Sequence, residues 1–75
     1  MRWNEKPRAY WIEIVGEALY EFSADLELLD FKDGAAQVRL LKGNYEEDLH
    51  IKLQDFVDSK TGGAVAIFFP QVGNS

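Results

Sequence analysis

An Asp-Gly pair near the middle of the chain constrains the fold more than any other feature. Asp33-Gly34 separates residues 29–32 from residues 36–40, and in both segments apolar and polar side chains alternate. Such alternation is typical of a strand with one buried face. A two-residue turn between paired strands needs positive φ, which glycine adopts without steric cost. The sequence therefore predicts a tight β-hairpin around this pair.

Three further segments have the composition or the alternation of strands. Residues 9–15 are rich in β-branched and aromatic side chains, which suit a pleated sheet. In residues 49–57 apolar and polar side chains alternate at first, and a bulge is expected where the alternation breaks. Residues 64–69 form an apolar run that Pro70 ends, because proline lacks a donor for the sheet ladder. Short strands joined by turns predict a small antiparallel barrel or sandwich.

Residues 17–31 support two interpretations. Apolar side chains recur from Ala18 to Leu29 at the three- and four-residue spacing of a helix face. Against a helix, no Ser, Thr, Asp or Asn caps its start, and the segment continues directly into the predicted hairpin. A helix, and a strand followed by a loop, therefore both remain open for residues 17–29.

Length and composition restrict the chain to one small domain without cross-links. A chain of 75 residues has no room for a second core, and with no Cys and one His it can form neither a disulfide framework nor a four-ligand Cys/His zinc site. We expect a tail over residues 1–8 and a single domain over residues 9–75. The sequence shows neither a membrane-spanning apolar run nor a signal peptide, so a cytoplasmic protein is expected.

The charge balance restricts the expected partners and chemistry. Thirteen acidic and eight basic residues give a net charge of −5, which disfavours nucleic acid and anionic membrane surfaces as partners. Glu46-Glu47-Asp48 is expected in a solvated loop and lacks the ligand spacing of an EF-hand. His50 is expected on a solvent-exposed strand face, and no Ser has the context of a catalytic nucleophile. The sequence thus predicts no enzyme activity, no metal site and no cofactor.

Three motifs, taken in chain order, resemble those of SH3 domains. Ala18-Leu19-Tyr20-Glu21-Phe22 is similar to the family's Ala-Leu-Tyr-Asp-Tyr signature, residues 29–34 resemble its diverging turn, and Phe68-Phe69-Pro70 resembles its Leu-Phe-Pro. The resemblance implies an all-β fold, a small five-stranded antiparallel barrel, here with an N-terminal strand-like extension. It also implies a non-catalytic protein-interaction domain that binds a proline-rich or basic extended peptide in an aromatic groove.

The resemblance further implies which residues bind that peptide. Two aromatic side chains would line the groove, a proline would form part of its floor, and acidic side chains in two loops would select a basic residue of the ligand. The family's groove Trp and final Tyr are missing, and the loss of these aromatic walls predicts a changed ligand or binding mode. The implied peptide-binding residues are Tyr20, Phe22, Asp25, Glu27, Glu46, Glu47, Asp48 and Pro70.

A second hypothesis treats the chain as a free-standing acidic accessory or inhibitor protein. Such a protein would bind a macromolecular partner through exposed Trp3 and Trp11 and through its carboxylates. Trp11 is at the same time a candidate for packing within the predicted strand over residues 9–15. The two hypotheses place the binding surface on different residues, and neither specifies an oligomeric state.

Overall fold

The Asp33-Gly34 turn joins two antiparallel strands, β1 (Leu26–Lys32) and β2 (Ala35–Leu40), in the computed structural model of this chain. The two turn residues have φ of 50° and 81°, and a type I′ turn requires positive values at both central positions. Lys32 pairs with Ala35 directly beside the turn. The predicted hairpin is therefore confirmed.

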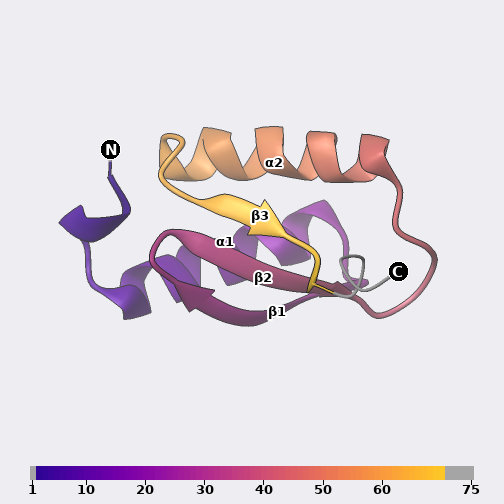
Figure 1. Cartoon of the computed structure of the whole chain (residues 1–75), viewed down its shortest axis with the longest axis horizontal. Coiled ribbons are helices and arrows are strands. Elements are labelled where there is room, and N and C mark those ends of the chain that lie inside the picture. The colour runs from indigo at the N-terminus through magenta and orange to yellow at the C-terminus, as the bar shows by residue number, and fades with distance from the viewer. Residues whose placement is uncertain (1, 71–75) are drawn as a thin grey trace.

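The third strand, β3 (Ala66–Phe68), lies parallel to β2, so that the strand order is β1-β2-β3 (Figure 1). Parallel neighbours need a crossover connection, which the chain makes through the helix α2 (Glu47–Thr61). A strand within residues 64–69 is confirmed, whereas the strand predicted over residues 49–57 is wrong. The structure describes residues 2–70.

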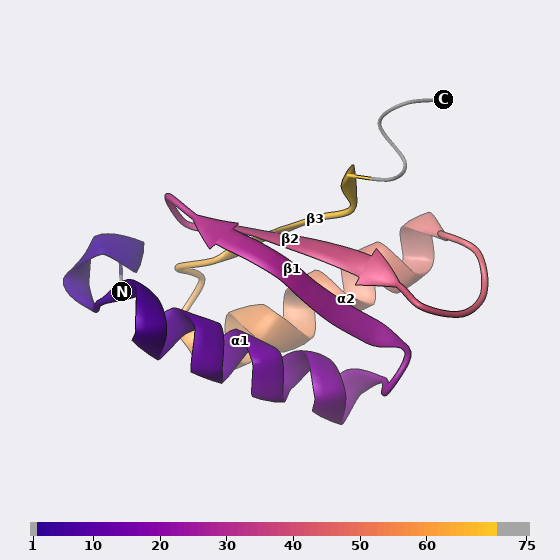
Figure 2. The same ribbon diagram turned by 90° about the horizontal axis from the view of Figure 1, so that it is seen from below.

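Two helices cover one face of the sheet. Figure 2 shows α1 (Arg8–Phe22) and α2 on the same side of the three strands, and the other face is open. In the middle of β2, Ala36 and Val38 face the helices and are buried, whereas Gln37 is half-buried and Arg39 is exposed. The expected all-β, five-stranded SH3-like barrel is wrong, because the described residues form an open three-stranded sheet and two α-helices.

Helix α1 replaces the strand-like extension that local composition suggested for residues 9–15. Its apolar period becomes visible only when the whole segment is considered, since the buried side chains lie on one helical face. Burial of this face outweighs the modest cost of β-branched residues in a helix. The helix begins after Pro7, which explains why no cap occurs near residue 17. The buried residues of α1 are Trp11, Val15, Ala18 and Leu19.

Helix α2 has the end signals that stabilise a helix. Glu47 and Asp48 lie in the first turn, where negative charge interacts favourably with the helix dipole, and Lys60 lies in the last turn. Gly62 follows the helix with φ of 67°, the left-handed conformation of a C-terminal cap. The alternation in residues 49–57 therefore belongs to a helix in which every fourth residue faces the core, namely Leu53, Val57 and Thr61.

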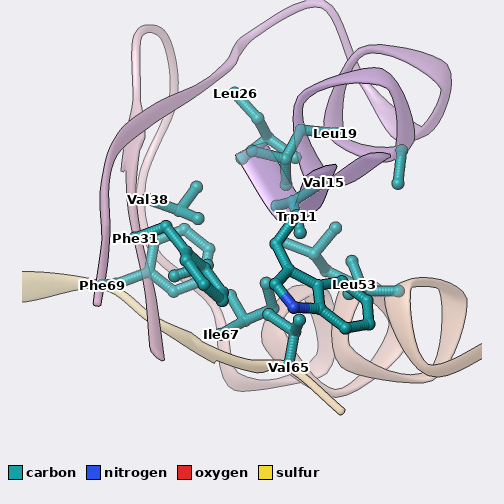
Figure 3. Packing of buried hydrophobic residues seen from close by; sticks show 13 residues of the cluster. Trp11, Val15, Leu19, Leu26, Phe31, Val38, Leu53, Val65, Ile67 and Phe69 are labelled. Atoms are coloured by element: carbon teal, nitrogen blue, oxygen red, sulfur yellow. The ribbon is translucent and has the colours of Figure 1, made fainter. Parts of the chain in front are cut away.

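The hydrophobic core lies between the sheet and the two helices. Figure 3 shows the Trp11 indole reaching from α1 toward Leu53 of α2, toward Ile67 of β3 and toward Val65, which directly precedes β3. Trp11 is 1% exposed, so it packs within the core rather than on the surface. No helix within residues 2–70 has the length and apolar character needed to cross a membrane.

The first eight residues, expected as a tail, include a 3-10 helix, η1 (Trp3–Glu5), that packs on the domain. The indole Nε1 of Trp11 donates a hydrogen bond to the carbonyl oxygen of Trp3. The Trp3 ring lies over the hairpin turn, where a Cβ on Gly34 would come within 2.7 Å of its Cδ1 atom. The opposite end of the expected domain, residues 71–75, lies outside the described residues.

Candidate functional site

The residues implied by the SH3 resemblance lie on several different elements. The aromatic pair belongs to α1, the first two acids to the start of the hairpin, the acidic run to the start of α2, and the proline follows β3. Helix α1 packs mainly on β1 and α2, whereas β3 packs on β2 and α2. In the same chain order, these residues are Tyr20, Phe22, Asp25, Glu27, Glu46, Glu47, Asp48 and Pro70.

Tyr20 and Phe22 do not form one aromatic wall. Residues two apart on a helix point about 200° away from each other, whereas on a strand they would share a face. Tyr20 is 74% exposed. Phe22 is half-buried and packs on Phe56 of α2, with ring centroids 5.8 Å apart. Only Tyr20 therefore remains available to a partner.

The implied acidic loop residues lie in regular secondary structure or directly beside it. Glu27 forms an ion pair with Arg39 across the open face of the sheet. The backbone carbonyl of Asp25 accepts a hydrogen bond from the amide of Leu41, 2.7 Å away, which extends the hairpin. Glu46 immediately precedes α2 and the next two acids occupy its first turn, so this run is a helix start rather than the expected solvated loop.

His50 and Gln54 cover the outer edge of β3, a role that the strand prediction missed. The Nε2 atom of His50 donates to the carbonyl oxygen of Ile67, 2.8 Å away, and its Nδ1 atom forms a hydrogen bond of 2.8 Å with the hydroxyl of Tyr45. The side chain of Gln54 accepts from the amide of Ile67 at 2.8 Å and donates to the carbonyl of Val65 at 2.9 Å. A four-residue spacing of polar side chains on a helix is the sequence signal for this arrangement.

The outer face of α1 gathers exposed aromatic, acidic and small residues. One row at four-residue spacing carries Ile12, Gly16 and Tyr20, and the row beside it carries three glutamates. Together they line a shallow groove on the helix surface. We call this set the α1 outer face: Ile12, Glu13, Gly16, Glu17, Tyr20 and Glu21.

Most of the negative charge on the α1 outer face is not neutralised by the domain itself. Glu21 lies 3.6 Å from the ammonium of Lys60 on α2. Among residues 2–70 the other ion pairs join Arg8 to Asp30 and Arg39 to Glu27, so neither Glu13 nor Glu17 has a basic partner there. The face therefore presents an exposed phenol beside uncompensated carboxylates.

Within the described part of the chain, no group of three His, Asp or Glu side chains is arranged to hold a metal ion. Comparisons with protein families, with curated proteins and with solved structures find no match for this chain.

Proposed function

We propose that this protein is a non-catalytic protein-interaction domain that binds a basic helical segment of a partner protein on the α1 outer face. The exposure of Tyr20 carries the proposal. At 74% it is the most exposed large hydrophobic residue of residues 2–70, and it projects from a rigid helix rather than a loop. Tyrosine is among the residues that most often act as anchors at protein interfaces, because it buries a large ring at little cost in entropy.

The glutamates beside Tyr20 determine the charge of the expected partner. Glu13 and Glu17 have no basic partner among residues 2–70, so Lys or Arg side chains of a ligand could pair with them without displacing an ion pair of that part of the chain. Charges at the rim of an interface act mainly on the association rate and on orientation. A ligand with basic residues at helical spacing would match the four-residue spacing of this acidic row.

Gly16 gives the α1 outer face its shape. A Cβ at this position would meet no atom within 4 Å apart from its chain neighbours and the nearby backbone of α1 itself, so no side chain or other element packed there requires glycine. The missing side chain leaves a notch between Ile12 and Tyr20 on the same row of the helix. An apolar side chain of the partner would occupy this notch, while its basic residues lie along the glutamates.

The proposal is tested by NMR titration of the labelled chain with a short amidated helical peptide that carries one row of Lys and one row of Leu. Amide shifts should concentrate in residues 12–21. Tyr20→Ala should weaken binding by about 10-fold or more, since an aromatic anchor contributes roughly 2 kcal/mol. A twin peptide with Glu in place of Lys should not bind.

Helix α2 provides the matched control, because it also exposes an apolar side chain among acids. Ile51 is 53% exposed and lies near Glu47 and Asp55. Ile51→Ala should leave the affinity unchanged, and Glu13→Gln with Glu17→Gln should weaken binding more than Glu47→Gln with Asp55→Asn. Shifts spread equally over both helices, with no loss of affinity in Tyr20→Ala, would overturn the proposal.

A further inference from the structure

A small cleft at the other end of the molecule lies between the N-terminal segment, the start of α1 and the hairpin turn. Three aromatic residues, Trp3, Trp11 and Phe31, form its apolar walls. The cleft has a volume of about 160 Å³. An apolar cavity of about 150 Å³ holds one benzene ring, so this cleft accommodates one ring or a group of similar size.

The walls of this cleft, which we call the Trp3 cleft, are held in place by contacts within the domain. Trp11 and Phe31 are core residues with exposures of 1% and 2%. Trp3 is fixed through its backbone carbonyl, which accepts the hydrogen bond from Trp11 Nε1. Its ring rests on Gly34, where there is no room for a side chain. A ligand would therefore meet a site formed in advance, at little cost of reorganisation.

Basic side chains surround the cleft although the protein is acidic overall. Lys6, Arg8 and Lys32 line it, three of the eight basic residues in a chain with a net charge of −5. Arg8 is occupied, since its Nε donates to the carbonyl of Phe31 at 2.8 Å and its Nη2 lies 2.7 Å from a carboxylate oxygen of Asp30.

The two lysines are the cations that remain for a ligand. Lys32 forms no ion pair among residues 2–70, and the ammonium of Lys6 lies 5.4 Å from the centre of the Tyr10 ring without a carboxylate partner there. Asp33 also lines the cleft and offsets part of this positive charge. The site thus combines an apolar pocket of ring size with two ammonium groups at its border.

We propose that the Trp3 cleft binds a small aromatic carboxylate, with the ring packed against the exposed Trp3 side chain above the buried Trp11 and Phe31 and the carboxylate near Lys6 and Lys32. The cleft is too small for a nucleotide, and its apolar walls do not favour a bare inorganic anion. The same chemistry is offered by a free aryl acid and by the terminal aromatic residue of a peptide. Phenylacetate represents the first source and N-acetylphenylalanine the second.

Intrinsic fluorescence tests this proposal directly, because the two Trp residues of the chain both line the cleft. Titration of phenylacetate into the full chain should give a saturable change with a dissociation constant on the order of 1 mM. Phenylacetamide, which keeps the ring but lacks the charge, should bind about 5-fold or more weakly. Tighter binding of N-acetylphenylalanine would identify a peptide C-terminus as the source, and tighter binding of phenylacetate a free acid.

Two double variants with the same change in net charge distinguish binding at the Trp3 cleft from a general effect of the protein's charge. Lys6→Gln with Lys32→Gln should weaken phenylacetate binding by about 5-fold or more, whereas Lys42→Gln with Lys52→Gln should not change it. A fluorescence change that rises linearly with phenylacetate concentration would overturn the proposal. Equal loss of affinity for phenylacetate in the two double variants would overturn it as well. Inorganic phosphate giving the same saturable change would also overturn it, since the ring would then be irrelevant. Tyr20→Ala should bind phenylacetate normally, so failure here and failure of the proposed function are distinguishable.

Discussion

Gly16 is the residue at which stability and the proposed function make opposite demands. It lies in the middle of α1, where glycine costs about 0.5–1 kcal/mol relative to alanine. Apart from its two chain neighbours and the nearby backbone of α1 itself, no atom lies within 4 Å of the Cβ that alanine would add. Gly16→Ala should therefore raise the free energy of unfolding by about 0.5–1 kcal/mol in a urea titration.

The same substitution at Gly34 is the control for Gly16→Ala. Gly34 has φ of 81°, and a side chain there would collide with Trp3, so Gly34→Ala should destabilise the protein. If Gly16→Ala destabilised the protein as well, the outer surface of α1 would not be open at that position. If Gly16→Ala stabilised the protein without weakening the binding of the peptide that carries Lys and Leu rows, the notch would have no part in binding.

Ile51 and Leu53 distinguish the helix from the strand that the sequence suggested. On a strand both side chains would lie on the same buried face, but on α2 Leu53 is 0% exposed and Ile51 is 53% exposed. Leu53→Ala should lower the free energy of unfolding by about 2–5 kcal/mol, and Ile51→Ala should change it by less than about 0.5 kcal/mol. Urea titrations of the two variants give both values. Equal losses would indicate that residues 49–57 form a strand.

The hairpin and β3 could be predicted because their signals are local. A turn that needs positive φ and an apolar run ended by proline are each fixed by a few adjacent residues. Residues 9–15 of α1 and residues 49–57 of α2 were predicted as strands because their local composition is that of strands, whereas for residues 17–22 a helix was one of the two interpretations left open. Leu49, Ile51 and Leu53 alternate as strand residues do, while Leu49, Leu53 and Val57 also keep the four-residue spacing of a helix face.

The helical end signals of α2 could have decided between these two patterns. Acids in the first turn, Lys60 in the last and glycine immediately after the helix all favour a helix. The SH3 motifs failed for a related reason. Ala18 and Leu19 are buried as helix residues, so the signature sequence has a core role on α1 that needs no barrel. The α1 outer face followed from none of these patterns, because Tyr20 acquires its exposure only from the helical period.

Gln54 connects α2 to the outer edge of β3, where its side chain makes hydrogen bonds that a neighbouring strand would otherwise make. Its side chain satisfies the amide of Ile67 and the carbonyl of Val65. Gln54→Ala leaves both backbone groups without these partners and should cost about 1–3 kcal/mol. Hydrogen exchange at the Ile67 amide should become faster, because a free strand edge opens readily to water.

A conservative variant separates the hydrogen bond that Gln54 accepts from those that it donates. Gln54→Glu still accepts from the Ile67 amide but can donate neither to the Val65 carbonyl nor to the carboxylate of Asp58. It should be less stable than the wild type, because its own carboxylate would lie beside that of Asp58, but it should protect the Ile67 amide from exchange better than Gln54→Ala does. Gln37→Ala, on the open face of β2, is the matched control and should have a smaller effect. Unchanged exchange at Ile67 in Gln54→Ala would mean that the edge is protected by the packing of α2 alone.

Charge is distributed unevenly over the molecule. The two helices carry seven acidic and three basic residues, and one of these three, Arg8, gathers with Lys6 and Lys32 at the Trp3 cleft. Such an asymmetry orients charged ligands before they make contact. A basic segment is attracted to the helical layer and a small carboxylate to the cleft. The two proposed surfaces therefore select ligands of opposite charge and can be occupied independently.

At one end of the molecule, Trp3 contacts Trp11 of α1 and Gly34 of the hairpin turn. Removal of residues 1–6 tests how much these contacts contribute to the stability of the domain. The truncation takes away the carbonyl that accepts from Trp11 Nε1 and the ring that covers Gly34. We expect a loss of about 1–3 kcal/mol, for one lost hydrogen bond and the exposure of apolar surface around Trp11. A domain of this size has a total stability of about 4–11 kcal/mol, so the loss would be a large share. Urea titration gives the change, and Trp11, then the sole tryptophan, should emit at longer wavelength in the folded state.

The variant Trp3→Phe is the control for this truncation. It keeps the backbone carbonyl and a smaller ring, so it should lose less stability than the truncated chain. A truncated chain as stable as the full one would show that the N-terminal segment does not stabilise the domain. Trp3 would then not be held in place as a wall of the Trp3 cleft, and the cleft would not be formed in advance.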